Sequence, residues 1–247
     1  RDGERVRFVG GAAREAPTIF ARLDAMGRSC AALFFPATYP PDRLEHGVFV
    51  SGWDSPVAFR ADASFVHPRS LHTTLVERFG EIRFDDVDEF DADRDGWHEA
   101  LAPALERRIA RKIELARFLL DARDWDLFAI YFGELDTASH HLFAHHDPAS
   151  PRHPGTTPAR GGLARVHRAI DRAVSEITRA AGGDSVEVTI VSDHGSGPAS
   201  DRVLHVNRAL ESAGLLRFAD AAPRGAVLAF LKDAALTKLP PALRERI

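Results

Sequence analysis

The chain has 247 residues, of which 45% are hydrophobic and 28% are charged, a composition typical of one large globular α/β domain or two small ones. The net charge is −4, and Lys and Arg are scattered among acidic residues, so we expect no nucleic acid partner. No apolar run approaches the ~20 residues that span a bilayer, so no membrane segment is expected in this chain. The single cysteine, Cys30, excludes an internal disulfide framework; it favours a cytoplasmic protein and leaves an exported or periplasmic one open.

Helix and strand patterns alternate in the first part of the chain. Residues 16–26 carry apolar side chains on one helical face, and Gly27 ends the pattern. The run CAALFF (30–35) is continuous and apolar, as in a buried parallel strand. Further on, Ser70 is expected to cap a short helix that Gly80 ends.

The alternation continues through the second part of the chain. The expected elements are, in order, a long helix over 97–122, a strand LFAIYF over 127–132, a Pro/Gly-rich linker or lid over 148–162, a second long helix over 163–181, a strand VEVTIV over 186–191 and a helix over 205–213. Apolar strands separated by helices of this length predict an α/β fold. We therefore expect a mainly parallel sheet with helices on both faces.

Two acid–imidazole pairs follow two of these predicted strands. Asp136 and His140 come after the strand over 127–132, and Asp193 and His194 come after the strand over 186–191. In an open α/β sheet the functional side chains collect at the carboxyl ends of the strands. The two pairs are separated by about one helical crossover, so we expect them to lie side by side at one edge of the sheet.

Each pair has the chemistry of a metal site. Four residues apart on a helical turn, Asp136 and His140 would have Cβ atoms about 5–6 Å apart, so both side chains could reach one ion. Asp193 and His194 could share an ion if the chain turns sharply, which the following Gly195 favours. Carboxylate and imidazole ligands together suit Zn²⁺ or Mn²⁺ better than Ca²⁺. Taken singly, either pair could also be an ordinary surface helix or turn.

Other polar clusters are given non-functional interpretations. His141, His145 and His146 extend the histidine-rich stretch LDTASHHLFAHHD, and we expect them to be solvated or to support other ligands. Residues 91–96 match the first half of an EF-hand loop. The twelfth position, which should be a bidentate Glu, is Ala102, so we interpret this segment as an acidic surface loop.

Three segments together resemble a known family: FPATYPPDRLEHGVFVSGWDSP (35–56), WDLFAIYFGELDTASHHLF (125–143) and IVSDHGSGPASDRVLHVNRALESAGLL (190–216). They are similar to the type I phosphodiesterase/nucleotide pyrophosphatase branch of the alkaline phosphatase superfamily. The resemblance implies that 1–247 is a partial alkaline-phosphatase-like α/β catalytic domain. Segments 57–96 and 148–162 are candidates for a cap or an insertion.

The resemblance also implies a function. Members of this family are phosphoester hydrolases that use two divalent metal ions, with zinc expected before manganese. Asp136 and His140 match the pair that binds one ion, and Asp193 and His194 match the pair that binds the second. The expected substrate is a phosphate ester or nucleotide-like small molecule. The family's Thr or Ser nucleophile is expected upstream of Arg1 and a last metal-binding His beyond the final residue, so we expect an interior piece with little activity alone.

Alternative interpretations remain open from the sequence. A degraded relative could keep the fold as a non-catalytic binding module. A phosphomutase or sulfatase relative is a further alternative, although the chain has no Cys/Ser-x-Pro-x-Arg motif and Cys30 lies in an apolar strand. The resemblance further suggests that the loop PATYPP (36–41) forms a pocket wall, with Ser51 and Asp54 as candidate lining residues.

Overall fold

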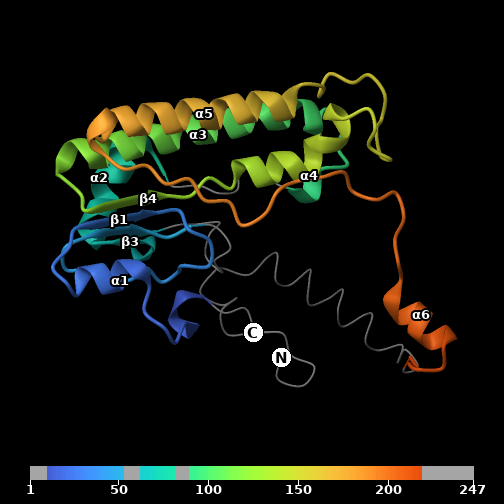
Figure 1. Cartoon of the computed structure of the whole chain (residues 1–247), viewed down its shortest axis with the longest axis horizontal. Coiled ribbons are helices and arrows are strands. Elements are labelled where there is room, and N and C mark those ends of the chain that lie inside the picture. Colours follow the sequence, from blue (N-terminus) through green and yellow to red (C-terminus); the bar gives the residue numbers. More distant parts are fainter. Residues whose placement is uncertain (1–9, 53–61, 82–88, 219–247) are drawn as a thin grey trace. The chain divides into compact units, whose positions relative to one another are not determined.

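A four-stranded sheet with strand order β3-β2-β1-β4 forms the centre of the first part of the chain (Figure 1). The computed structural model describes residues 10–52, 62–81 and 89–218. Contact clustering divides the chain into two units, Arg1–Ala199 and Ser200–Ile247, and each is described by itself. None of the helices among the described residues has the length and apolar character needed to cross a lipid bilayer.

The sheet is mainly parallel, as predicted. Strand β1 pairs in parallel with β2 on one side and with β4 on the other, whereas β3 runs antiparallel to β2. The strands are β1 Cys30–Leu33, β2 Val48–Val50, β3 Val66–His67 and β4 Leu127–Ile130. The sequence predicted β1 and β4. Strands β2 and β3 span only three and two residues, which is too short for a hydrophobic pattern to reveal.

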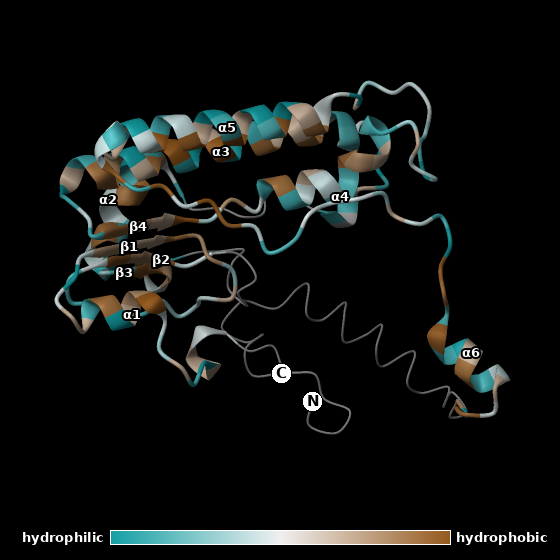
Figure 2. Ribbon diagram, viewed as in Figure 1, coloured by the Kyte–Doolittle hydropathy of each residue, from teal (hydrophilic) through white to brown (hydrophobic). Residues whose placement is uncertain are grey.

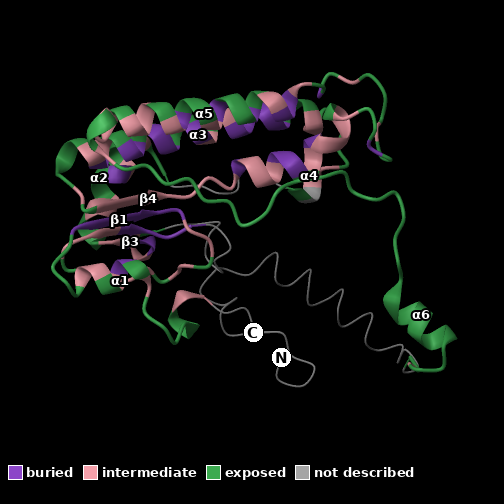
Figure 3. Cartoon of the chain, in the orientation of Figure 1, coloured by how far each residue is buried: buried purple, intermediate pink, exposed green. Residues whose placement is uncertain are grey.

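Helices cover both faces of the sheet, which confirms the predicted α/β class. Phe20 of α1 packs with Cys30 and Ala32 on one face, whereas Leu33 packs with α2 and α3 on the other. Every residue of β1 is therefore buried (Figure 3). The helices of the first unit are α1 Ile19–Asp24, α2 Arg69–Phe79, α3 Trp97–Ala122, α4 Glu134–His146 and α5 Gly162–Ala180. In the second unit, α6 spans Val206–Ser212.

A second apolar cluster joins the long helices. Leu105 and Ile109 of α3 pack against Ala138 and Leu142 of α4 and against Val166 of α5, all of them buried. The apolar stripes of α3 and α5 face each other along their length (Figure 2). Helices α3 and α5 extend past the end of β4 and pack against α4.

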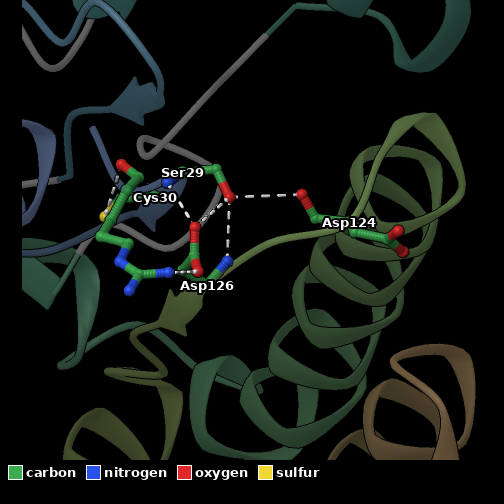
Figure 4. A network of polar contacts seen from close by, with 5 residues as sticks. Ser29, Cys30, Asp124 and Asp126 are labelled. Atoms are coloured by element: carbon green, nitrogen blue, oxygen red, sulfur yellow. Dashed lines mark hydrogen bonds and ion pairs between the residues drawn. The ribbon is translucent and has the colours of Figure 1, made fainter.

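A polar network fixes the amino ends of β1 and β4 (Figure 4). Asp126 accepts hydrogen bonds from the backbone N–H of Ser29 at 2.8 Å and from its hydroxyl at 3.0 Å, and Arg28 pairs with the same carboxylate at 3.1 Å. The Ser29 backbone bond is the main reason that the pKa of Asp126 lies below its usual range. The network fixes the register between β1 and β4, and hence the position at which the chain leaves β4 and enters α4.

Two predictions about the elements are wrong. Residues 186–191 do not form a strand; all of them except Val186 are exposed, with Ile190 75% and Val191 84% accessible. An apolar β-branched run becomes a strand only when another strand satisfies its backbone groups, and none of the described strands pairs with it. In addition, α2 begins at Arg69 with Pro68 as its N-cap, so Ser70 lies inside the first turn and does not cap the helix.

Candidate functional site

Helix α4 presents Asp136 and His140 at the carboxyl end of β4. Glu134, Ala138 and Leu142 lie one turn apart and are buried, whereas Asp136 and His140 lie on the opposite side of the helix. The His140 side chain is 69% exposed and that of Asp136 is 38% exposed, with Nε2 of the imidazole 3.5 Å from Oδ1 of the carboxylate. The structure therefore brings the two predicted ligands together on an accessible helical face.

The separation of this pair fits a shared ion. A distance of 3.5 Å is too long for a strong hydrogen bond. Two ligand atoms that bind one tetrahedral Zn²⁺ at ~2.0–2.2 Å lie roughly 3.3–3.6 Å from each other. The oxygen and the nitrogen of this pair thus already have the spacing of two neighbouring ligands.

Asp193 and His194 show a similar spacing in a different setting. His194 Nε2 lies 3.6 Å from Asp193 Oδ2, and both side chains are mostly exposed. The ring nitrogen Nδ1 of His194 lies 3.0 Å from the carbonyl oxygen of Gly195, which can only accept, so Nδ1 carries the proton of the neutral ring. This tautomer leaves the Nε2 lone pair available for a metal.

An electrostatic interaction connects the two pairs. The pKa of His194 lies above its ordinary value, first because of the hydrogen bond with Gly195, then because of the negative charges of Asp193 and Asp136. The contribution of Asp136 is smaller than that of Asp193. Nevertheless, within 10–52, 62–81 and 89–218 no three His, Cys, Asp or Glu side chains are arranged so that they could hold one metal ion.

The other histidines of α4 contact neighbouring segments. His141 Nε2 lies 2.9 Å from Oε2 of Glu89, and His145 Nδ1 lies 2.8 Å from the hydroxyl of Thr157. The ring of His98 packs 4.8 Å from that of His145. Burial is the main cause that lowers the pKa of both His98 and His145. These contacts attach the 148–162 linker and the start of α3 to α4, while His146 is exposed.

The EF-hand-like segment and the 36–41 loop have other partners. The Asp91 carboxylate pairs with Arg94 at 2.7 Å, so it acts within its own turn. Tyr39 and its two neighbouring prolines line a pocket of about 380 Å³ beside β3, and none of the four predicted ligands lines it. Ser51 is fully buried and donates to the carbonyl of Thr38, whereas Asp54 lies outside the described residues.

The sequence interpretation missed a buried ion pair beneath this site. Lys112 Nζ lies 2.7 Å from Oε1 of Glu134, with the two side chains only 8% and 1% exposed. A signal was present in the sequence: Lys112 falls on the apolar stripe of α3 formed by Leu105, Ile109 and Ala116. A lysine at such a position needs a buried partner, but the sequence does not say which acid supplies it.

A family model described as Type I phosphodiesterase / nucleotide pyrophosphatase matches residues 1–244. No curated protein and no solved structure was found to match the chain. The family match covers nearly the whole sequence, includes both acid–imidazole pairs and agrees with the mainly parallel α/β sheet. The chain therefore belongs to the type I phosphodiesterase/nucleotide pyrophosphatase family of hydrolases.

Proposed function

We propose that the chain functions as a metal-dependent phosphoester hydrolase that uses two divalent cations, zinc or manganese. Asp136 and His140 would hold one ion, and Asp193 and His194 the other. The observation that carries this proposal is the spacing of the two pairs, 3.5 and 3.6 Å between carboxylate oxygen and imidazole nitrogen. The influence of the Asp136 charge on His194 supports a common site.

The four side chains have defined tasks in such a site. The carboxylates supply negative charge, and the neutral imidazoles supply nitrogen lone pairs, so the pairs match borderline cations. When bound, two ions would polarise phosphoryl oxygens and stabilise the charge of an in-line displacement. The hydrogen bond from His194 to the Gly195 carbonyl orients the ring and, in the neutral ring, places the proton on Nδ1 so that Nε2 has its lone pair. The proposed substrate is a phosphate ester or nucleotide-like molecule, and no residue is assigned as nucleophile.

Metal binding is the first test of this proposal. Two protein ligands for each ion leave most of the coordination shell to water, so we expect weak binding by the 247-residue chain. Calorimetric titration with Zn²⁺ should give two sites, of which Asp136→Ala removes one and Asp193→Ala the other. Asp201→Ala, outside both pairs, is the matched control and should leave both sites intact. Unchanged binding in both of the first two variants would refute the assignment.

Hydrolysis is the second test. We expect slow turnover of bis-p-nitrophenyl phosphate that requires Zn²⁺ or Mn²⁺ and disappears with a chelator or with Asp193→Ala. The exposure of Asp193 and His194 favours a second candidate function, a non-catalytic phosphate-ester binding module that keeps one ion. That function predicts ligand binding without any metal-dependent turnover, so the same assay distinguishes the two.

A further inference from the structure

A buried ion pair lies directly below the first turn of α4. The side chain of Lys112 is 8% exposed and that of Glu134 is 1% exposed, and 2.7 Å separates Nζ from Oε1. The contact is ionic, because neither carboxylate oxygen of Glu134 receives a well-oriented hydrogen bond from the described residues. Glu134 is the first residue of α4 and stands two residues before Asp136.

Lys112 connects the segments that meet at this point. Its ammonium donates to the carbonyl of Tyr131 at 3.1 Å, just after β4 ends. It also lies 5.1 Å from the centre of the Phe34 ring and 5.4 Å from that of Phe132, within the range of a cation–π interaction. One side chain of α3 thus contacts the segments that follow β1 and β4, as well as the start of α4.

Stability alone does not explain why a buried ion pair occupies this position. Moving two charges out of water is costly, and replacing a buried ion pair with well-packed apolar side chains is often neutral or stabilising. Its neighbours on the same stripe of α3, Ile109 and Ala116, are apolar. An ion pair at this position differs from an apolar contact mainly because it has a direction: it fixes where the carboxylate of Glu134 must lie.

That direction determines the orientation of α4. Ala138 and Leu142 hold the later turns by apolar packing, which allows small rotations and shifts along the helix axis. At the first turn, the N-cap residue is Gly133, which offers no side-chain hydrogen bond to the helix. Leu135 of that turn packs against the apolar cluster, and the Lys112–Glu134 pair adds a contact with a defined direction. Asp136 and His140 lie on the opposite face, so their positions follow from it.

We propose that Lys112 and Glu134 are positioning residues that set the rotation of α4, so that Asp136 and His140 together can bind one divalent cation. The inference rests on the proposed function, because it assigns a purpose to the α4 pair. Outer contacts that orient metal ligands typically change metal affinity by about 10–100-fold when they are removed. We expect a loss of this size at the α4 site and no change at the site of Asp193 and His194.

The test is a Co²⁺ titration of the full chain, followed by the visible absorption of the bound ion, with thermal melting measured in parallel. Glu134→Gln and Lys112→Met should each lower both the melting temperature and the affinity of the α4 site. A double variant, Lys112→Met with Glu134→Leu, removes both charges. It should recover the melting temperature but keep the weak affinity, a separation that a purely structural role would not produce.

Two controls make the outcome decisive. Leu75→Ala removes a fully buried side chain of α2, away from α4, and should lower the melting temperature while leaving Co²⁺ affinity unchanged. Asp136→Ala should abolish the α4 site. If Asp136→Ala has no effect on binding, both the proposed function and the inference fail. If Asp136→Ala weakens Co²⁺ binding and the double variant binds Co²⁺ as tightly as the parent, the inference alone is overturned. Should the single variants not fold, the double variant still decides.

Discussion

Helix α4 and the segment 186–199 carry matching chemistry on opposite kinds of scaffold. In α4, the buried residues Glu134, Ala138 and Leu142 fix the helix, and the acid–imidazole pair lies on its accessible face. In 186–199, every residue except Val186 is exposed, and no backbone amide of 187–199 donates a hydrogen bond to another described residue. The spacing within each pair is nevertheless almost equal.

The contrast shows that the spacing of ligand atoms and the rigidity of their support are separate properties. The helix geometry sets the spacing of an i, i+4 pair, and packing against the core fixes the position of the helix. Adjacent residues acquire a suitable geometry from a local turn, here aided by the His194 contact with Gly195, without any core beneath them. We therefore expect the two acid–imidazole pairs to respond differently to mutation, hydrogen exchange and pH.

The largest expected difference is in amide hydrogen exchange. Core helices open with free energies approaching the global stability, whereas exposed segments without hydrogen bonds exchange almost freely. We expect the amides of Ala138 and Leu142 to exchange at least about a thousand times more slowly than those of 187–199, by mass spectrometry or NMR. Excess Zn²⁺ should slow exchange in 187–199 more than in α4. Equal protection of the two regions in the metal-free chain would contradict the comparison.

The second largest difference is expected in the free energy of unfolding when one apolar side chain is truncated in each region. Leu142 is fully buried, so Leu142→Ala should reduce the free energy of unfolding by about 2–5 kcal/mol. Val191 is 84% exposed, so Val191→Ala should change it by less than about 0.5 kcal/mol. Urea denaturation measures both values. A large loss with Val191→Ala would mean that this segment is packed in solution.

The smallest expected difference is in histidine titration. Burial lowers the pKa of His145 in α4 and of His98, which packs on it, whereas the Gly195 contact and the charges of Asp193 and Asp136 raise that of His194. NMR titration of the metal-free chain should therefore place the first two below about 6.5 and the third above it. A single shared midpoint would argue against the packing of His98 on His145.

These shifts also give opposite signs for stability. Since the folded state disfavours the charged form of His98 and His145, their contribution is fully present above the unfolded pKa and is lost as the pH falls from there toward the folded pKa. The contribution of His194 is present below the unfolded pKa and is lost as the pH rises through the folded pKa. Thermal melts of His145→Gln and of the parent should converge as the pH is lowered from the ordinary histidine pKa of about 6.5.

The sequence alone predicted much of the fold and named the candidate site residues. Continuous apolar runs predicted β1 and β4, and 3.6-residue periodicity predicted α3 and α5 to within one residue. These predictions succeeded because burial of one face is a local, periodic requirement. The positions of the acids and imidazoles after two apolar runs, with the family resemblance, identified the four candidate ligands.

The tertiary structure decided what local patterns cannot encode. The run 186–191 has the composition of a strand, yet strand formation depends on pairing with a distant segment, and this run has none among the described residues. In the same way, Lys112 interrupts an apolar stripe in the sequence, and only the fold brings it to Glu134 at the start of α4. Hydrophobic periodicity in the sequence indicates which side chains become buried. The partners that they meet inside depend on contacts between residues far apart in the chain.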